Sequence, residues 1–255
     1  MSLRRITVPR TTAQRIVVSV IGCLLSLGML SAHADGGVSF SRNRLIYNEK
    51  DKAISIAALN HGDAPYLIQA GVSGDADKTT TAPFLVTPPL FRLDGRAQNM
   101  MRIMKVGAPL PADRESVFYF YATAIPGQGD EGGKDADADG KNTVGAKLSI
   151  AMKTILKLFY RPRNLPVTID QAHGMMQFVQ QGNTVVIKNP TPYYQSFAQL
   201  KFDGAEQNLD THESMVAPMS NLSFPTTARV NTVTWSVMTD YGGTTPPVSQ
   251  NITHP

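Results

Sequence analysis

Residues 148–160 read LSIAMKTILKLFY, from Leu148 to Tyr160. Period-two alternation places one row of side chains on a single face of an extended strand: Leu148, Ile150, Met152, Thr154, Leu156, Leu158 and Tyr160. Such a strand would span roughly 43 Å, about twice the usual length. We expect part of it, including Leu148, Ile150 and Met152, to lie at a sheet edge, because a small domain cannot cover both flanks throughout. Long apolar edges recruit other chains, which predicts strand donation to a partner; the alternative is a long central strand paired on both flanks at home.

The chain from Asp35 onward consists of short alternating runs separated by Gly, Pro, Asn and Asp clusters, with no sustained helical periodicity. The expected strands are 38–47, 53–60, 66–72, 100–106, 117–123 and 148–160, then 175–180, 184–188, 193–202, 215–218 and 230–239. This pattern predicts an all-β fold of two immunoglobulin-like β-sandwich domains. We expect domains at 35–160 and 167–255, joined by a stiff Pro-containing hinge at 161–166, RPRNLP.

The first 34 residues carry the only strong charge bias. Four arginines precede Ile16, no Asp or Glu occurs before Asp35, and the rest of the chain carries equal numbers of basic and acidic residues. The basic start, the apolar run at 16–30 and the Ala32-His33-Ala34 pattern predict a cleavable secretory signal at 1–34, without membrane insertion after cleavage. The only cysteine, Cys23, lies within it, so we expect an exported chain without disulfides.

Other chemistries lack their required residues. Asp135, Asp137, Asp139 and Gly140 resemble the opening of a calcium loop, but Ala146 stands where a bidentate Glu is needed. The GQGDEG run at 127–132 opens no expected helix and is too acidic for a pyrophosphate. The histidines show no metal-ligand spacing, and there is neither a G-x-S-x-G motif nor a basic-aromatic cluster. We therefore expect no catalytic residues, no metal or cofactor, and no nucleic-acid partner.

Seven short motifs follow one another along the chain: RNR at 42–44, PYLIQA at 65–70, TPP at 87–89, DRESVFYF at 113–120, LFYRP at 158–162, NPTPYY at 189–194 and DYGG at 240–243. Each motif is weak alone, but the ordered set resembles the periplasmic pilus-assembly chaperones of the chaperone–usher pathway. The resemblance runs from about Val38 to Gly243. The resemblance implies a boomerang of two immunoglobulin-like domains that acts in the periplasm.

The resemblance also implies partners and roles. The partners would be pilus subunits, each an incomplete sandwich, and an outer-membrane usher that receives them. Leu148, Ile150 and Met152 would enter the subunit's open groove, by donor-strand complementation. Arg44 and Lys157 would together hold the subunit's terminal carboxylate; the alternative is that they are solvated strand charges.

The resemblance further implies an interdomain salt bridge of Glu115, Arg161 and Asp240. Because surface ion pairs contribute only about 0–1 kcal/mol, we expect this bridge to set orientation more than stability. The loop at 127–145 is long and domain two lacks a cysteine pair, so the subclass is open. The rival function is an exported adhesin or glycan-binding module, but a single Trp and few aromatic residues fit that function poorly. A weaker third is a β-sandwich hydrolase, for which the sequence offers only scattered candidates instead of a paired-carboxylate or Ser-His constellation.

Overall fold

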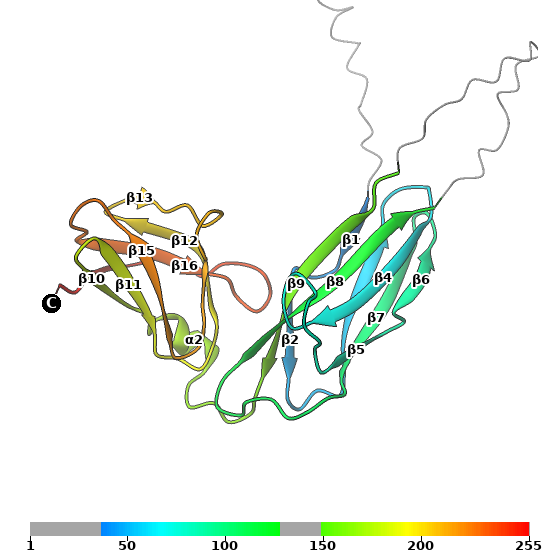
Figure 1. The fold of residues 1–255 in the computed structure, drawn as a ribbon, viewed down its shortest axis with the longest axis horizontal. Helices are drawn as coiled ribbons and strands as arrows, with labels where there is room; N and C mark the ends of the chain where they lie inside the picture. The colour runs from blue at the N-terminus through cyan, green and yellow to red at the C-terminus, as the bar shows by residue number, and fades with distance from the viewer. Residues whose placement is uncertain (1–36, 128–148, 255) are drawn as a thin grey trace, which may run out of the picture. The chain divides into compact units, whose positions relative to one another are not determined.

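The described part of the chain folds into two β-sandwiches of mostly antiparallel strands, each with its own apolar core (Figure 1). The computed structural model describes residues 37–127 and 149–254. The expected signal at 1–34, Leu148, the calcium-like run and most of the GQGDEG run lie outside the described residues. Within the described part, the all-β fold class predicted from the sequence is confirmed.

The first sandwich packs a four-stranded sheet, in the order β1-β3-β7-β5, against a five-stranded sheet, in the order β2-β9-β8-β4-β6. The strands are β1 (Val38–Phe40), β2 (Arg44–Asn48), β3 (Ile54–Asn60), β4 (Tyr66–Ser73), β5 (Phe84–Thr87), β6 (Leu90–Leu93), β7 (Gln98–Lys105), β8 (Ser116–Pro126) and β9 (Met152–Arg161). Inward residues of both sheets form its core, among them Leu45, Ile56, Met101, Phe120 and Leu158.

The second sandwich has a three-stranded sheet, β10-β11-β15, and a five-stranded sheet, β13-β12-β16-β17 with β14 paired to β12. Its elements are α2 (Ile169–His173), β10 (Gln177–Gln181), β11 (Thr184–Asn189), β12 (Gln195–Phe202), β13 (Ala205–Glu206), β14 (Met215–Val216), β15 (Ser220–Pro225), β16 (Thr232–Val237) and β17 (Val248–Asn251). Trp235 packs against Phe178 in its core, with ring centroids 4.7 Å apart.

The expected strand at 38–47 is instead two strands in different sheets. β1 pairs antiparallel with β3, whereas β2 pairs parallel with β9. Polar Ser41, Arg42 and Asn43 separate them, and Ser41 bonds to Ala57 through both its backbone N–H and its hydroxyl. The break lets the chain cross from one sheet of the first sandwich to the other, so a single run of alternation contributes side chains to the same core from both sheets.

The long strand is also shorter than expected. It begins at Met152 instead of Leu148, and residues 149–151 form no strand. Its antiparallel pairing with β8 ends at Ala124 and Met152. Continuing the register would bring Pro126 opposite Ile150, and proline has no N–H to donate. Ile150 therefore precedes the strand that we expected to contain it.

Among the described residues, no helix has the length and apolar character needed to cross a membrane.

Candidate functional site

Strand β9 is paired on both flanks over less than half of its length, at residues 157–160. β8 pairs with Met152 through Tyr160, while β2 pairs only with Lys157 through Arg161. Residues 152–156 thus have β8 on one flank and no strand on the other within the described part of the chain. Figure 1 shows β9 beside β8, with β2 along its other flank. The fully paired central strand, which was the alternative, is not what this half of β9 forms.

The row of apolar side chains changes its surroundings along β9. Leu158 and Tyr160 are buried in the core of the first sandwich, and Leu156 packs against that core. Met152 and Ile150, farther toward the N-terminus, are 68% and 64% exposed. The same row therefore completes the chain's own core at one end and presents apolar surface beside the free edge at the other.

Arg44 and Lys157 are direct cross-strand partners on the parallel strands β2 and β9. Arg44 is only 7% exposed, its guanidinium lies 4.1 Å from the centre of the Phe159 ring, and its Nη1 donates to Ser196 Oγ at 3.3 Å. Arg44 Nε is buried and has no hydrogen-bond partner among the described residues. Neither cation forms an ion pair with a carboxylate in residues 37–127 and 149–254.

The surroundings of both cations disfavour their charge. Burial and the neighbouring Arg44 charge lower the pKa of Lys157. Burial also lowers the pKa of Arg44, which nevertheless stays protonated because a guanidinium holds its proton throughout the physiological range. Two neighbouring cations that form no ion pair among the described residues are suited to bind an anion, and they lie where the free edge of β9 begins.

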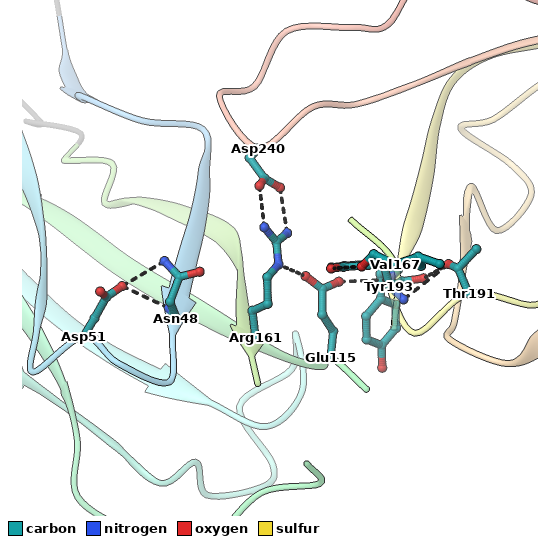
Figure 2. A network of polar contacts seen from close by, with 9 residues as sticks. Asn48, Asp51, Glu115, Arg161, Val167, Thr191, Tyr193 and Asp240 are labelled. Atoms are coloured by element: carbon teal, nitrogen blue, oxygen red, sulfur yellow. Dashed lines mark hydrogen bonds and ion pairs between the residues drawn. The ribbon is translucent and has the colours of Figure 1, made fainter. Parts of the chain in front are cut away.

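Glu115, Arg161 and Asp240 come together in one network (Figure 2). Arg161 Nε donates to Glu115 Oε1 at 2.8 Å, and Nη1 and Nη2 donate to the two oxygens of Asp240 at 2.6 and 2.8 Å. Glu115 precedes β8, Arg161 ends β9 and Asp240 follows β16. Arg161 therefore joins a carboxylate of the first sandwich to one of the second.

Glu115 is buried and its two partners are partly buried, so the expectation of a surface ion pair was wrong. The side chains of Glu115, Arg161 and Asp240 are 1%, 14% and 23% exposed. Glu115 is held at both ends, because its Oε2 accepts from the Tyr194 N–H at 2.9 Å and its own N–H donates to the Pro192 carbonyl at 2.8 Å. Although burial disfavours its charge, the hydrogen bonds to Asp240 and the charge of Glu115 raise the pKa of Arg161.

Sequence reasoning missed the residues that support these side chains. Phe159 lies under Arg44 and contacts Tyr194 at 5.6 Å between ring centroids. Asn189 donates to the carbonyls of Tyr193, Val216 and Ala217, which fixes the NPTPYY segment that meets Glu115. The motif was visible in the sequence, but its role as a support was not, because the partners of Asn189 lie up to 28 residues away.

Residues 37–127 and 149–254 contain no group of three or more His, Cys, Asp or Glu side chains that could hold a metal ion. His61, expected in a turn, lies within hydrogen-bond distance of Ser39 Oγ, at 2.6 Å.

The chain resembles known proteins along both sandwiches. Residues 37–166 match the family described as pili and flagellar-assembly chaperone, PapD N-terminal domain, and residues 171–249 match the pili assembly chaperone PapD, C-terminal domain. The probable fimbrial chaperone protein ElfD of Escherichia coli K12 is 33% identical over 234 residues, covering 91% of this chain and 94% of ElfD.

Solved structures agree with this match. The E. coli chaperone DraB is 30% identical with a TM-score of 0.72, over 85% of this chain and 98% of DraB. The structure of the Salmonella enterica SafA pilin in complex with the SafB chaperone matches at 28% identity and a TM-score of 0.73, over 85% of this chain and 96% of the matched chain. These relatives are chaperones, and the adhesin alternative is not favoured. The chain therefore belongs to the PapD-type pili assembly chaperone family.

Proposed function

We propose that this chaperone captures pilus subunits by donor-strand complementation in the periplasm and delivers them to an outer-membrane usher. The observation that carries the proposal is the partly paired strand β9, whose free edge at 152–156 adjoins two cations that form no ion pair in the described part of the chain. The free edge supplies main-chain hydrogen-bond donors and acceptors, and the apolar row supplies side chains for an incomplete core. The two cations supply a binding site for the subunit's terminal carboxylate.

The free edge provides most of the affinity through its apolar side chains. Main-chain hydrogen bonds contribute about 1 kcal/mol net each, whereas a fully buried aliphatic side chain contributes about 1.5–3 kcal/mol. Ile150 and Met152 are exposed in the free chaperone, so their burial in a subunit groove is a net gain. Leu148 would extend the same row by one position.

Arg44 and Lys157 would bind the terminal carboxylate of the subunit and thereby fix its register. A slip of one residue would turn every side chain of the added strand to the wrong face. Charge-assisted bonds to a carboxylate are roughly twice as strong as neutral ones. The binding would also satisfy Arg44 Nε, which has no partner in the described part of the free chain.

The Glu115–Arg161–Asp240 network would hold the two sandwiches for this task. We propose the boundaries 35–160 and 167–255 for the two domains, with 161–166 as the hinge. Residues 1–34 would be the cleaved signal that takes the chain to the periplasm. The network is worth more than an exposed pair, because breaking a buried ion pair leaves an uncompensated charge.

Co-expression with the cognate subunit tests the anchor. We expect wild type to yield a soluble one-to-one complex, and Arg44→Ala and Lys157→Ala each to abolish it. Lys157→Met, which keeps the aliphatic length, guards against loss by misfolding. Arg42→Ala and Lys50→Ala are matched controls at exposed positions. Capture by both anchor variants at the wild-type level, with all proteins folded by circular dichroism, would contradict the assignment.

A further inference from the structure

A second set of side chains lies beside the free edge, on the face of the sheet opposite to the core. Phe120 and Ala122 of β8, and Leu158 of β9, point into the core. Because neighbouring residues of a strand point to opposite faces, Tyr121, Lys153 and Ile155 point outward. Together with Lys78 from the turn after β4, these residues form what we call the outer cluster: Lys78, Tyr121, Lys153 and Ile155.

The strand registers show that rows of outward-facing side chains, followed across the sheet, end at different strands. The row of Ser73, Tyr119 and Lys157 continues onto β2 with Arg44. The next row, Gly71, Tyr121 and Ile155, ends at β9, as does the row of Gln69, Thr123 and Lys153. A strand added to the free edge would therefore place outward side chains directly beside Ile155 and Lys153, where β2 provides none.

Lys78 is held in place by a closed turn. The Asp75 carboxylate accepts hydrogen bonds from the backbone N–H groups and the hydroxyls of Thr79 and Thr80. Lys78 has a left-handed backbone, with φ at 63°, and its Nζ lies 3.5 Å from the centre of the Tyr121 ring. A cation over an aromatic face is attracted to it. The turn thus fixes a positive charge above the outer face.

The Tyr121 ring is itself positioned by the absence of a side chain. It lies across Gly71, its cross-strand neighbour on β4, and a Cβ at Gly71 would collide with the Tyr121 hydroxyl. The ring therefore lies over Gly71, with the Lys78 ammonium over its face. Ile155, which is 39% exposed, continues the same row of side chains toward the free edge.

The two lysines of the outer cluster have no opposite charge to pair with. Neither Lys78 nor Lys153 forms an ion pair within the described ranges 37–127 and 149–254. Burial lowers the pKa of Lys78, and repulsion by the like charge of Lys153 lowers it further. An acidic side chain placed beside them would relieve this repulsion.

We propose that the outer cluster is a second recognition surface, which reads the outward-facing residues of the subunit strand bound to the β9 edge. An apolar side chain of that strand would pack on Ile155 and Tyr121, and an acidic one would lie beside Lys78 and Lys153. The inference rests on the proposed function, since it needs the subunit strand on this edge. It adds a determinant of subunit choice that is separate from the groove-filling row and from the carboxylate anchor.

The test compares two double variants of equal charge change in binding the cognate subunit. Lys78→Gln with Lys153→Gln removes the two positive charges, and Lys50→Gln with Lys52→Gln is the control at exposed positions of the turn after β2. At about 50 mM salt we expect the first variant to lose about three- to tenfold in affinity, with a slower association, and the control to match wild type. At about 500 mM salt the loss should shrink, because salt screens exposed charges. Lys78→Arg with Lys153→Arg should bind like wild type.

The outcomes separate the two proposals. If wild type captures the subunit but the Lys78/Lys153 variant equals the control at low salt, the outer cluster has no such role and the proposed function stands. A loss of affinity that is equally large at both salt concentrations contradicts the inference that the two lysines act through their charge. If wild type fails to capture the subunit at all, the proposed function itself is wrong.

Discussion

Gln195 illustrates how single buried groups set the stability of the second sandwich. It is 1% exposed, and both its Oε1 and its Nε2 are buried without a hydrogen-bond partner among the described residues. Gln180 offers the contrast, because its amide donates to the carbonyls of Gly182 and Ala228 and accepts from the Val230 N–H. The same residue type is therefore satisfied at one position and unsatisfied at the other.

We predict that Gln195→Met raises the free energy of unfolding by about 1–2 kcal/mol, because it removes an unsatisfied buried amide while keeping the shape. Gln180→Met should lower it by about 2–4 kcal/mol, because it leaves several backbone groups unpaired. Urea titrations of both variants measure the difference. A destabilising Gln195→Met would contradict this account.

Lys157 gives the anchor a pH dependence. Burial and the Arg44 charge lower its pKa in the free chaperone, so its titration midpoint, followed by NMR at Cε, should lie below 10.5. The folded pKa is below the unfolded one, so the charged form costs stability at low pH, and this cost disappears as pH rises from the lowered pKa toward 10.5.

Subunit binding should respond to pH in the opposite direction. A bound carboxylate favours the charged lysine and raises its pKa, so capture takes up protons and weakens as pH rises through the lowered pKa. Affinity measured across alkaline pH should fall for wild type and stay flatter for Lys157→Met. An affinity of wild type that does not change over this range would exclude a charged Lys157 from the contact.

At the scale of elements, alternation predicted most strands but not where each one is paired. β3, β7 and β12 were expected close to their observed bounds, because half-buried strands alternate clearly. The short strands β5 and β6 were missed, since only four residues each flank the Thr87-Pro88-Pro89 turn. The helix α2 is a single turn capped by Thr168 and Gln171, too short to give a helical period.

The candidate site was predictable in its residues more than in its geometry. Motif positions indicated Arg44 and Lys157, but their cross-strand pairing depends on β2 running parallel to β9, a long-range pairing that local alternation does not encode. The start of β9 depends on where Pro126 ends the pairing of β8. The burial of Glu115 depends on Tyr194 and Pro192, which belong to the other sandwich.

At the scale of the whole molecule, the partly buried Arg161 is one of several residues that join the two sandwiches. Arg161 continues a strand of the first sandwich and bonds to Asp240 of the second through both guanidinium Nη atoms. Asn43 adds a weaker link, since its Nδ2 donates to the Gly242 carbonyl at 3.3 Å. Arg161 is therefore both the last residue of strand β9 and the cation that binds Asp240.

We predict that Asp240→Asn lowers the free energy of unfolding by about 1–3 kcal/mol, between the values for exposed and buried pairs. Subunit capture should also weaken, because the second sandwich would no longer be held against the anchor. Asp210→Asn, at an exposed turn position, is the control. Equal stability and equal capture for both variants would show that the network does not hold the sandwiches.

Hydrogen–deuterium exchange across the whole chain, with and without the cognate subunit, tests the central claim most directly. A peptide covering residues 152–156 should exchange readily in the free chaperone and become strongly protected in the complex, while residues 158–160, already paired on both flanks, change little. Protection that appears elsewhere and leaves 152–156 unchanged would contradict strand donation by β9.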